Sequence, residues 1–388
     1  MSTNYQDYLE LLSAEQHVQV DKLREAARNG VLPKVRGEVW MYLLGVLDSD
    51  KTSEMTSLKA LRQEYNALPS TLPSDLASLL LKTALAHHNR RFESPTYESL
   101  ISSITAEPGS APGGTASNNS APGSRAASTG YGMTPLAGLA AQGSASPGPP
   151  QDDRGGSGPL VPPPTASPTR AQYLSLMEDV LGKYWHSADC QPSSIEVAAG
   201  AGDSTGPRTK WLPGQPPAPA DWVYLATPFV CCLARPMAVF YGFEALMNKL
   251  KAWPPLPSRL GSVLGLFRLA LPELHEYFED EQVPMTAVAM SWMTSLLSRE
   301  MWLPDVLRLW DSYLASDDMF VLHCYVCVAI LFTCKETLEE LDGSEAKLML
   351  LDLPPLDVDR LLHDAANLKV AFPLPMPVTD DPDEYDDD

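Results

Sequence analysis

The stretch SWMTSLLSREMWLPDVLRLWDSYLAS, residues 291–316, decides the fold. Its apolar side chains recur every three to four residues in two runs, which predicts two helices joined by a short link. Trp310 shares an apolar stripe with Leu307, so the pattern predicts an aromatic side chain in the core. We expect the carboxylate of Asp311, the next residue, to form hydrogen bonds that hold the fold together.

A second informative stretch, NGVLPKVRGEVWMYLLGV, occupies residues 29–46. Gly30 is placed as a residue that ends one helix, and a proline opens the next. Arg36 and Trp40 lie at i and i+4, so the guanidinium can cover the indole or reach a neighbouring carboxylate. We expect both residues, like Trp310 and Asp311, to serve the scaffold rather than to contact a partner.

Helical spacing of apolar residues continues through most of the chain. In the N-terminal part the predicted helices are 5–29, 34–47, 54–65 and 73–92, the last with Ser74 and Asp75 at its cap. Further helical segments alternate with loops between 170 and 368. Among them are 221–253, which is apolar almost all round and therefore expected to be buried, and 257–281. Since no segment alternates as a strand does and no 30–45-residue unit repeats, we predict an all-α, irregular multi-helix domain.

Composition divides the chain into parts. Residues 1–101 and 170–372 carry the helical pattern, whereas 102–169 are rich in Gly, Ala, Ser and Pro. A second loop of that kind covers 191–219, and 373–388 form an acidic tail. Such segments bury too little apolar surface to offset their ordering entropy, so we predict that all three are disordered and that the two insertions interrupt one domain.

Charge and cysteine use exclude several classes of function. The chain has 49 acidic and 28 basic residues, a formal net charge of −21, which argues against binding nucleic acid or anionic lipid. Cys324 and Cys327 lie in an apolar helix without a second ligand pair, so we predict packing and no metal site. No Gly-rich phosphate loop occurs, and we expect no cofactor. Without a signal peptide or an apolar run of membrane-spanning length, we expect a cytoplasmic protein with no direct membrane insertion.

Both stretches resemble the TBC domain, the all-helical module of Rab GTPase-activating proteins. Arg36 and Trp40 match its Arg-x-x-x-Trp signature. The C-terminal stretch resembles the family's second half through its matching residues Trp292, Leu296, Leu297, Arg299, Glu300, Arg308, Trp310 and Asp311. The resemblance covers about 25–100 and 170–370. It implies a GTP-bound Rab-type small GTPase as partner and, through that GTPase, peripheral recruitment to endomembranes.

The resemblance also implies an arginine finger, an arginine that stabilises charge in the partner's nucleotide site. The family's Ile-x-x-Asp-x-x-Arg spacing fits LAHHNRRF if Leu85, His88 and Arg91 take the three positions. Arg91 is then the candidate finger, with His88 where a supporting carboxylate is expected. Arg90 takes the role if the register slips by one. The alternative reading is a basic helix end, favoured by the helix dipole.

The family's second catalytic motif, Tyr-x-Gln, is missing. Counting back from Thr227-Pro228, which match an Ala-Pro pair, puts Ala218 and Ala220 at the Tyr and Gln positions. Asp221 is the polar residue nearby, but a carboxylate would repel a γ-phosphate. Two hypotheses therefore stay open: a GTPase activator that uses an arginine finger, and a degenerate module that binds a GTPase or scaffolds a complex without activating hydrolysis.

Overall fold

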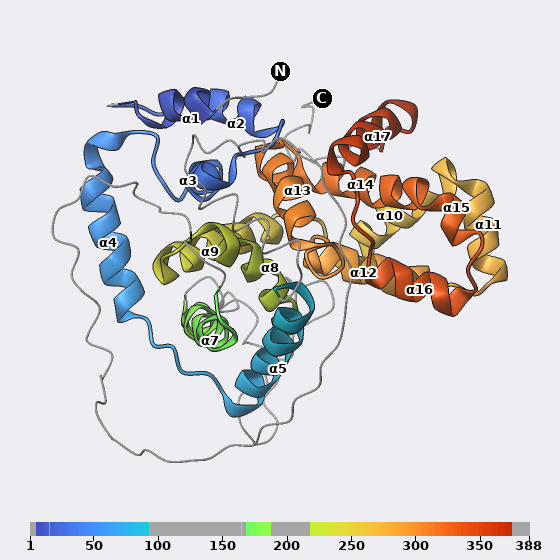
Figure 1. The fold of residues 1–388 in the computed structure, drawn as a ribbon, viewed down its shortest axis with the longest axis horizontal. Coiled ribbons are helices and arrows are strands. Elements are labelled where there is room, and N and C mark those ends of the chain that lie inside the picture. Colours follow the sequence, from blue (N-terminus) through green and yellow to red (C-terminus); the bar gives the residue numbers. More distant parts are fainter. Residues whose placement is uncertain (1–4, 15, 93–163, 165–167, 188–217, 375–388) are drawn as a thin grey trace, which may run out of the picture. The chain divides into compact units, whose positions relative to one another are not determined.

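A computed structural model of the chain describes residues 5–14, 16–92, 164, 168–187 and 218–374, all within one compact unit (Figure 1). The described residues form helices and no named strand, which confirms the all-α prediction. The helices are α1 (Tyr5–Leu12), α2 (Val20–Ala27), α3 (Pro33–Leu43), α4 (Glu54–Ala67), α5 (Ser74–Arg91), α7 (Arg170–His186), α8 (Pro219–Cys232), α9 (Pro236–Lys251), α10 (Leu256–Ala270), α11 (Pro272–Asp280), α12 (Met285–Ser295), α13 (Leu303–Ala315), α14 (Met319–Thr333), α15 (Lys335–Leu338), α16 (Gly343–Leu351) and α17 (Val358–Ala371), with one 3-10 turn at Lys51–Ser53.

Several predicted segments are shorter or divided in the structure. The segment 5–29 is two helices, α1 and α2, and proline separates others: Pro236 opens α9 after α8, and Pro272 opens α11 after α10. Proline lacks an N–H and fits the first turn, so a helix restarts there instead of continuing. The expected Ser74 cap is wrong, because Pro73 holds the N-cap position. The insertion 102–169 and the loop 191–219 lie almost entirely outside the described residues, as does all of the tail 373–388 beyond Leu374, and their disorder stays a prediction.

A buried polar cluster joins residues 31–40 to α13. The Asp311 carboxylate on α13 accepts hydrogen bonds from the Arg36 guanidinium at 3.0 Å, the Trp40 indole N–H at 2.8 Å and the Val31 main-chain N–H at 2.8 Å. Asp311 is 0% and Arg36 7% exposed. A buried ion pair is stable only when its remaining donors and acceptors are also paired, and here each partner is. Gly30 just before them has φ +96°, the left-handed conformation expected of a residue that ends a helix.

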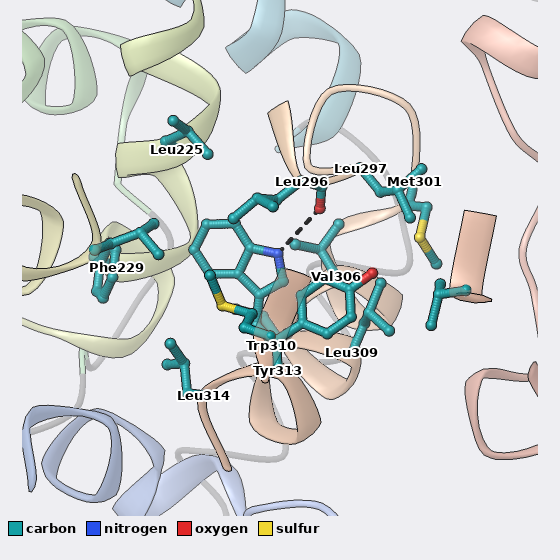
Figure 2. Close-up of a cluster of buried hydrophobic side chains, with 14 of the residues drawn as sticks. Leu225, Phe229, Leu296, Leu297, Met301, Val306, Leu309, Trp310, Tyr313 and Leu314 are labelled. Carbon is teal, nitrogen blue, oxygen red and sulfur yellow. Dashed lines mark hydrogen bonds between the residues drawn. The ribbon is translucent and has the colours of Figure 1, made fainter. Parts of the chain in front are cut away.

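The apolar core surrounds Trp310. Figure 2 shows its indole among Leu225 and Phe229 of α8 and neighbouring side chains of α13, with its N–H donating to the Leu296 carbonyl at 3.2 Å. Trp292 on α12 donates to the Leu350 carbonyl at 2.9 Å, which attaches α16 to α12. These two bonds satisfy the polar atoms of otherwise buried aromatic rings.

The described cysteines are buried free thiols, in agreement with a packing role. No group of metal-binding side chains occurs among the described residues. Within the same residues, no helix is both long and apolar enough to cross a bilayer. For the candidate site, the important packing is that of α5 against α7 and α8, and of α12 against α8 and α16.

Candidate functional site

Four segments that are distant in sequence meet at the candidate site: the end of α5, the first half of α8, the turn 296–300 after α12, and the residue that follows α16 (Figure 1). They bring together Arg90 and Arg91, Tyr224, Arg299 and Asp352. We call Arg90, Arg91 and Arg299 the arginine cluster.

The turn 296–300 has an unusual backbone. Leu296 and Leu297 both adopt the left-handed conformation, with φ of 52° and 64°. This conformation costs a non-glycine residue about 1–3 kcal/mol. Burial of both leucine side chains and the hydrogen bond from Trp310 to the Leu296 carbonyl hold it in place (Figure 2). As a result the chain reverses sharply after α12, and the carbonyls of Arg299 and Glu300 are turned toward α5.

A proline fixes this turn against α8. Pro228 lies inside α8 and has no N–H, so the Tyr224 carbonyl one turn earlier lacks its helical donor. The Ser298 hydroxyl of the turn donates to that carbonyl at 2.8 Å. The Tyr224 carbonyl, which lacks a donor within α8, thus forms a hydrogen bond that links α8 to the 296–300 turn.

Arg91 is an anchor in this arrangement. Its side chain is 2% exposed, and one guanidinium nitrogen donates to the Arg299 carbonyl at 2.9 Å and the Glu300 carbonyl at 2.7 Å. Burial, and next the charge of Arg90, lower the pKa of Arg91 to about 10. Arg91, the candidate finger, therefore does not project from the surface, because the end of α5 that carries it packs on the 296–300 turn.

Arg90 is the solvent-facing member of the pair. Its side chain is 36% exposed and pairs with the Asp352 carboxylate, and it donates to the Leu351 carbonyl at 2.9 Å. Asp352 also accepts from Arg91 at 3.2 Å. His88, expected to support the finger, stacks its ring on Phe92 at 5.0 Å, and one ring nitrogen lies 3.4 Å from the Pro168 carbonyl. Asp352, distant in sequence, provides the carboxylate that the arginine motif lacks.

Tyr224 lies beside Arg299. The Arg299 guanidinium covers its ring at 5.4 Å, and the His87 ring meets it edge-on at 4.9 Å. Burial raises the pKa of Tyr224, and the charges of Arg299 and Arg90 both oppose this rise. Burial also raises the pKa of Asp221, against a hydrogen bond from Thr294 and the charge of Arg299. The Asp221 carboxylate thus interacts electrostatically with Arg299.

Glu300 is a buried acid beneath the site. Its carboxyl is 0% exposed and accepts from the hydroxyls of Ser291 at 2.5 Å and Ser295 at 2.8 Å. Burial raises its pKa, while the two hydroxyls and Arg299 stabilise the ionised form. Its carbonyl also accepts from the Leu353 N–H at 3.0 Å, so Glu300 ties the segment after α16 to the turn.

His87 makes stability depend on pH. Burial, and next the charge of Arg91, lower the pKa of His87 to about 3, below the value of about 6.5 in an unfolded chain. Below pH 6.5 the unfolded state therefore binds a proton that the folded state does not, so stability is present above pH 6.5 and is lost as pH falls toward 3. We expect His87→Phe to reduce the slope of unfolding free energy between pH 6.5 and 5 by up to about 1.4 kcal/mol per pH unit. Urea unfolding at several pH values measures the slope, and an unchanged slope contradicts the assignment.

Two residues of the site, Asp352 and Tyr224, were not predicted from the sequence. Asp352 lies at the end of α16, a helix that the apolar pattern did not mark, although Asp342 and Glu345 form a capping box at its start. Tyr224 was read as part of a buried segment. The feature that could have singled it out is Pro228 four residues later, since an internal proline leaves the earlier carbonyl available to another segment.

Comparisons with known proteins agree on one family. Residues 221–339 match the family model described as Rab-GTPase-TBC domain. Human TBC1 domain family member 13 is 37% identical over 97 residues, 25% of this chain and 24% of that protein. Human TBC1 domain family member 22A is 39% identical over 107 residues, 26% of this chain and 21% of that protein. This chain therefore matches about a quarter of the length of these relatives.

One solved structure extends the likeness of fold beyond the matched segment. The crystal structure of the Ypt/Rab-GAP domain of Gyp1p matches with a TM-score of 0.54 and 16% identity, over 95% of this chain and 98% of that one. The family-model segment contains Tyr224, Arg299 and Asp311, whereas Arg90, Arg91 and Asp352 lie outside it.

Proposed function

The chain is a member of the TBC domain family, and on that premise we propose that it binds a GTP-bound Rab-type small GTPase and accelerates GTP hydrolysis. Phosphoryl transfer to water requires positive charge on the transferring and leaving oxygens. The observation that supports this proposal is the arginine cluster, which concentrates three guanidinium groups at one place in a chain of net charge −21.

Of the two candidate fingers, Arg90 is the one that we propose to enter the partner's nucleotide site. To extend, Arg90 gives up an exposed ion pair, which is worth about 0–1 kcal/mol. Arg91, whose side chain is buried, would give up bonds to two main-chain carbonyls and leave that of Arg299 without this donor. Arg91 and Asp352 then hold the end of α5 in place while Arg90 reaches out.

A second candidate function also has an observation behind it. Ala218 and Ala220 stand where the resembling family has its Tyr-x-Gln pair, and Ala220 has no polar atom to orient water. A chain whose arginines stay paired with Asp352 would bind a GTPase and leave its hydrolysis rate unchanged. In either case recruitment to membranes would come through the GTPase, which fits a role in vesicle trafficking.

Single-turnover GTP hydrolysis across a panel of Rab proteins tests the proposal. Binding of each Rab loaded with a non-hydrolysable GTP analogue is measured in parallel. Faster hydrolysis by at least one Rab supports the activator, whereas binding without any acceleration supports the non-activating module. Absence of both binding and acceleration across the panel contradicts both functions.

A further inference from the structure

We propose that Tyr224 is a catalytic residue whose hydroxyl contacts the attacking water or the γ-phosphate of the bound GTPase, in place of the missing glutamine. This inference rests on the proposed function and names a residue that neither the sequence motifs nor the comparisons single out.

Tyr224 lies on α8, one helical turn after the position of the missing glutamine. Ala220 holds the glutamine position, and Tyr224 follows it by four residues on the same helix, so both side chains lie on one face. Ala220 leaves space on that face, and the longer tyrosine side chain of the next turn can extend along it. The chain thus retains a polar group on the face where the glutamine would lie.

Among the described residues, the Tyr224 hydroxyl has no hydrogen-bond partner. Two buried tyrosines elsewhere use theirs within the fold: Tyr173 pairs with Thr227 at 2.8 Å, and Tyr313 with His323 at 2.7 Å. The Tyr42 hydroxyl also lacks a partner among the described residues, but it is enclosed in the core, where no ligand reaches it. The half-buried Tyr224 hydroxyl makes no hydrogen bond with another described residue. It can therefore donate to a phosphate oxygen, or accept from water and orient it.

The fold holds the Tyr224 ring in place. His87 packs edge-on at 4.9 Å and Arg299 covers the ring at 5.4 Å. The main chain is fixed by the Ser298 bond to the Tyr224 carbonyl at 2.8 Å. A donor fixed before the reaction stabilises developing charge without further reorganisation, which is the main source of electrostatic catalysis.

Charged side chains surround the Tyr224 hydroxyl. The Arg299 guanidinium covers the Tyr224 ring at 5.4 Å, so an anion that reaches the hydroxyl also meets a positive charge. Arg90 and the carboxylates of Asp221 and Glu300 act on this hydroxyl as well. Asp221 faces Arg299, and Asp352 faces Arg90. When a phosphate approaches, Arg90 can exchange the exposed Asp352 carboxylate for it. Arg299, and Arg90 once it leaves Asp352, thus supply positive charge for a triphosphate beside Tyr224.

The test removes only the hydroxyl. Tyr224→Phe retains the ring, its contact with His87 and its cover by Arg299. Hydrolysis by the Rab that the wild-type chain activates most is measured in single-turnover assays, and affinity is measured for the same Rab with a non-hydrolysable GTP analogue. We expect at least a tenfold lower rate of activated hydrolysis, because one preorganised donor is worth about 10²–10³ in rate. Affinity is expected to stay within about twofold, since the contact is made to the reacting group.

Tyr277→Phe is the matched control. It removes a half-buried hydroxyl on α11 that donates to the Leu341 carbonyl at 3.0 Å, outside the candidate site, and it should leave the activated rate unchanged. A Tyr224→Phe chain that activates as well as wild type overturns the role of Tyr224 and leaves the proposed function standing. Equal losses of rate and affinity overturn it too, because the hydroxyl then serves docking. A wild-type chain that activates no Rab overturns the proposed function and the role of Tyr224 with it.

Discussion

Arg90→Ala is expected to abolish the acceleration of GTP hydrolysis while the protein stays folded. An arginine finger supplied to a GTPase is worth about 10³–10⁵ in rate, so the activated rate should fall to that of the Rab alone. The Arg90 side chain is 36% exposed, and its contacts are with Asp352 and the Leu351 carbonyl at the surface. Its loss should change the free energy of unfolding by about 1 kcal/mol or less. Single-turnover hydrolysis and urea unfolding measure the two effects.

Arg91→Ala is the matched variant, one residue further along α5. It leaves the half-buried carbonyl of Arg299 without this donor and should lower the free energy of unfolding by about 1–3 kcal/mol. We therefore expect the two variants to differ: Arg90→Ala lowers the activated rate of hydrolysis, whereas Arg91→Ala lowers the free energy of unfolding. If Arg91→Ala is stable and inactive while Arg90→Ala activates normally, the finger is Arg91 and its buried contacts open on binding.

Asp311→Ala is expected to lower the free energy of unfolding by about 3–5 kcal/mol, because removal of one partner leaves a buried charge unpaired. The guanidinium of Arg36, the indole N–H of Trp40 and the main-chain N–H of Val31 would all lose their shared acceptor. Alanine cannot replace any of these bonds. Urea unfolding monitored by circular dichroism measures the loss.

Asp317→Ala provides the comparison for an exposed carboxylate. Asp317 follows α13, is 79% exposed at its side chain, and pairs with Arg28 at 3.1 Å. Its removal should change the free energy of unfolding by about 1 kcal/mol or less. Similar effects for the two variants would mean that the buried cluster contributes no more than a surface ion pair, against the role inferred for Asp311.

Much of the helical framework could be predicted from apolar spacing alone. The predicted helix 54–65 agrees with α4, Glu54–Ala67, and the predicted helix 73–92 agrees with α5, Ser74–Arg91. Periodicity reports which face of a segment is buried, and these helices each bury a face against neighbours. It does not report where a buried stretch restarts, so the junction of α8 and α9 at Pro236 was missed.

The candidate site was less predictable, because exposure and partners depend on tertiary contacts. Spacing identified Arg90 and Arg91 as alternatives but could not tell which one faces solvent, since both follow the same apolar stripe. Arg91 is the buried one because it binds carbonyls of the 296–300 turn, which lies about two hundred residues away in sequence. Asp352 could not be found from the motif, which has its carboxylate three residues before the arginine.

The anchoring of Arg91 has a consequence for how this protein can change over evolution. It fixes the last turn of α5 to the main chain of the 296–300 turn, immediately before the long connection that leads to α7. Because main-chain carbonyls are present whatever the residue, this attachment survives substitutions at Arg299 and Glu300. The entropic cost of closing a loop grows only with the logarithm of its length. Insertions and deletions after α5 can therefore accumulate in descendants without displacing Arg90.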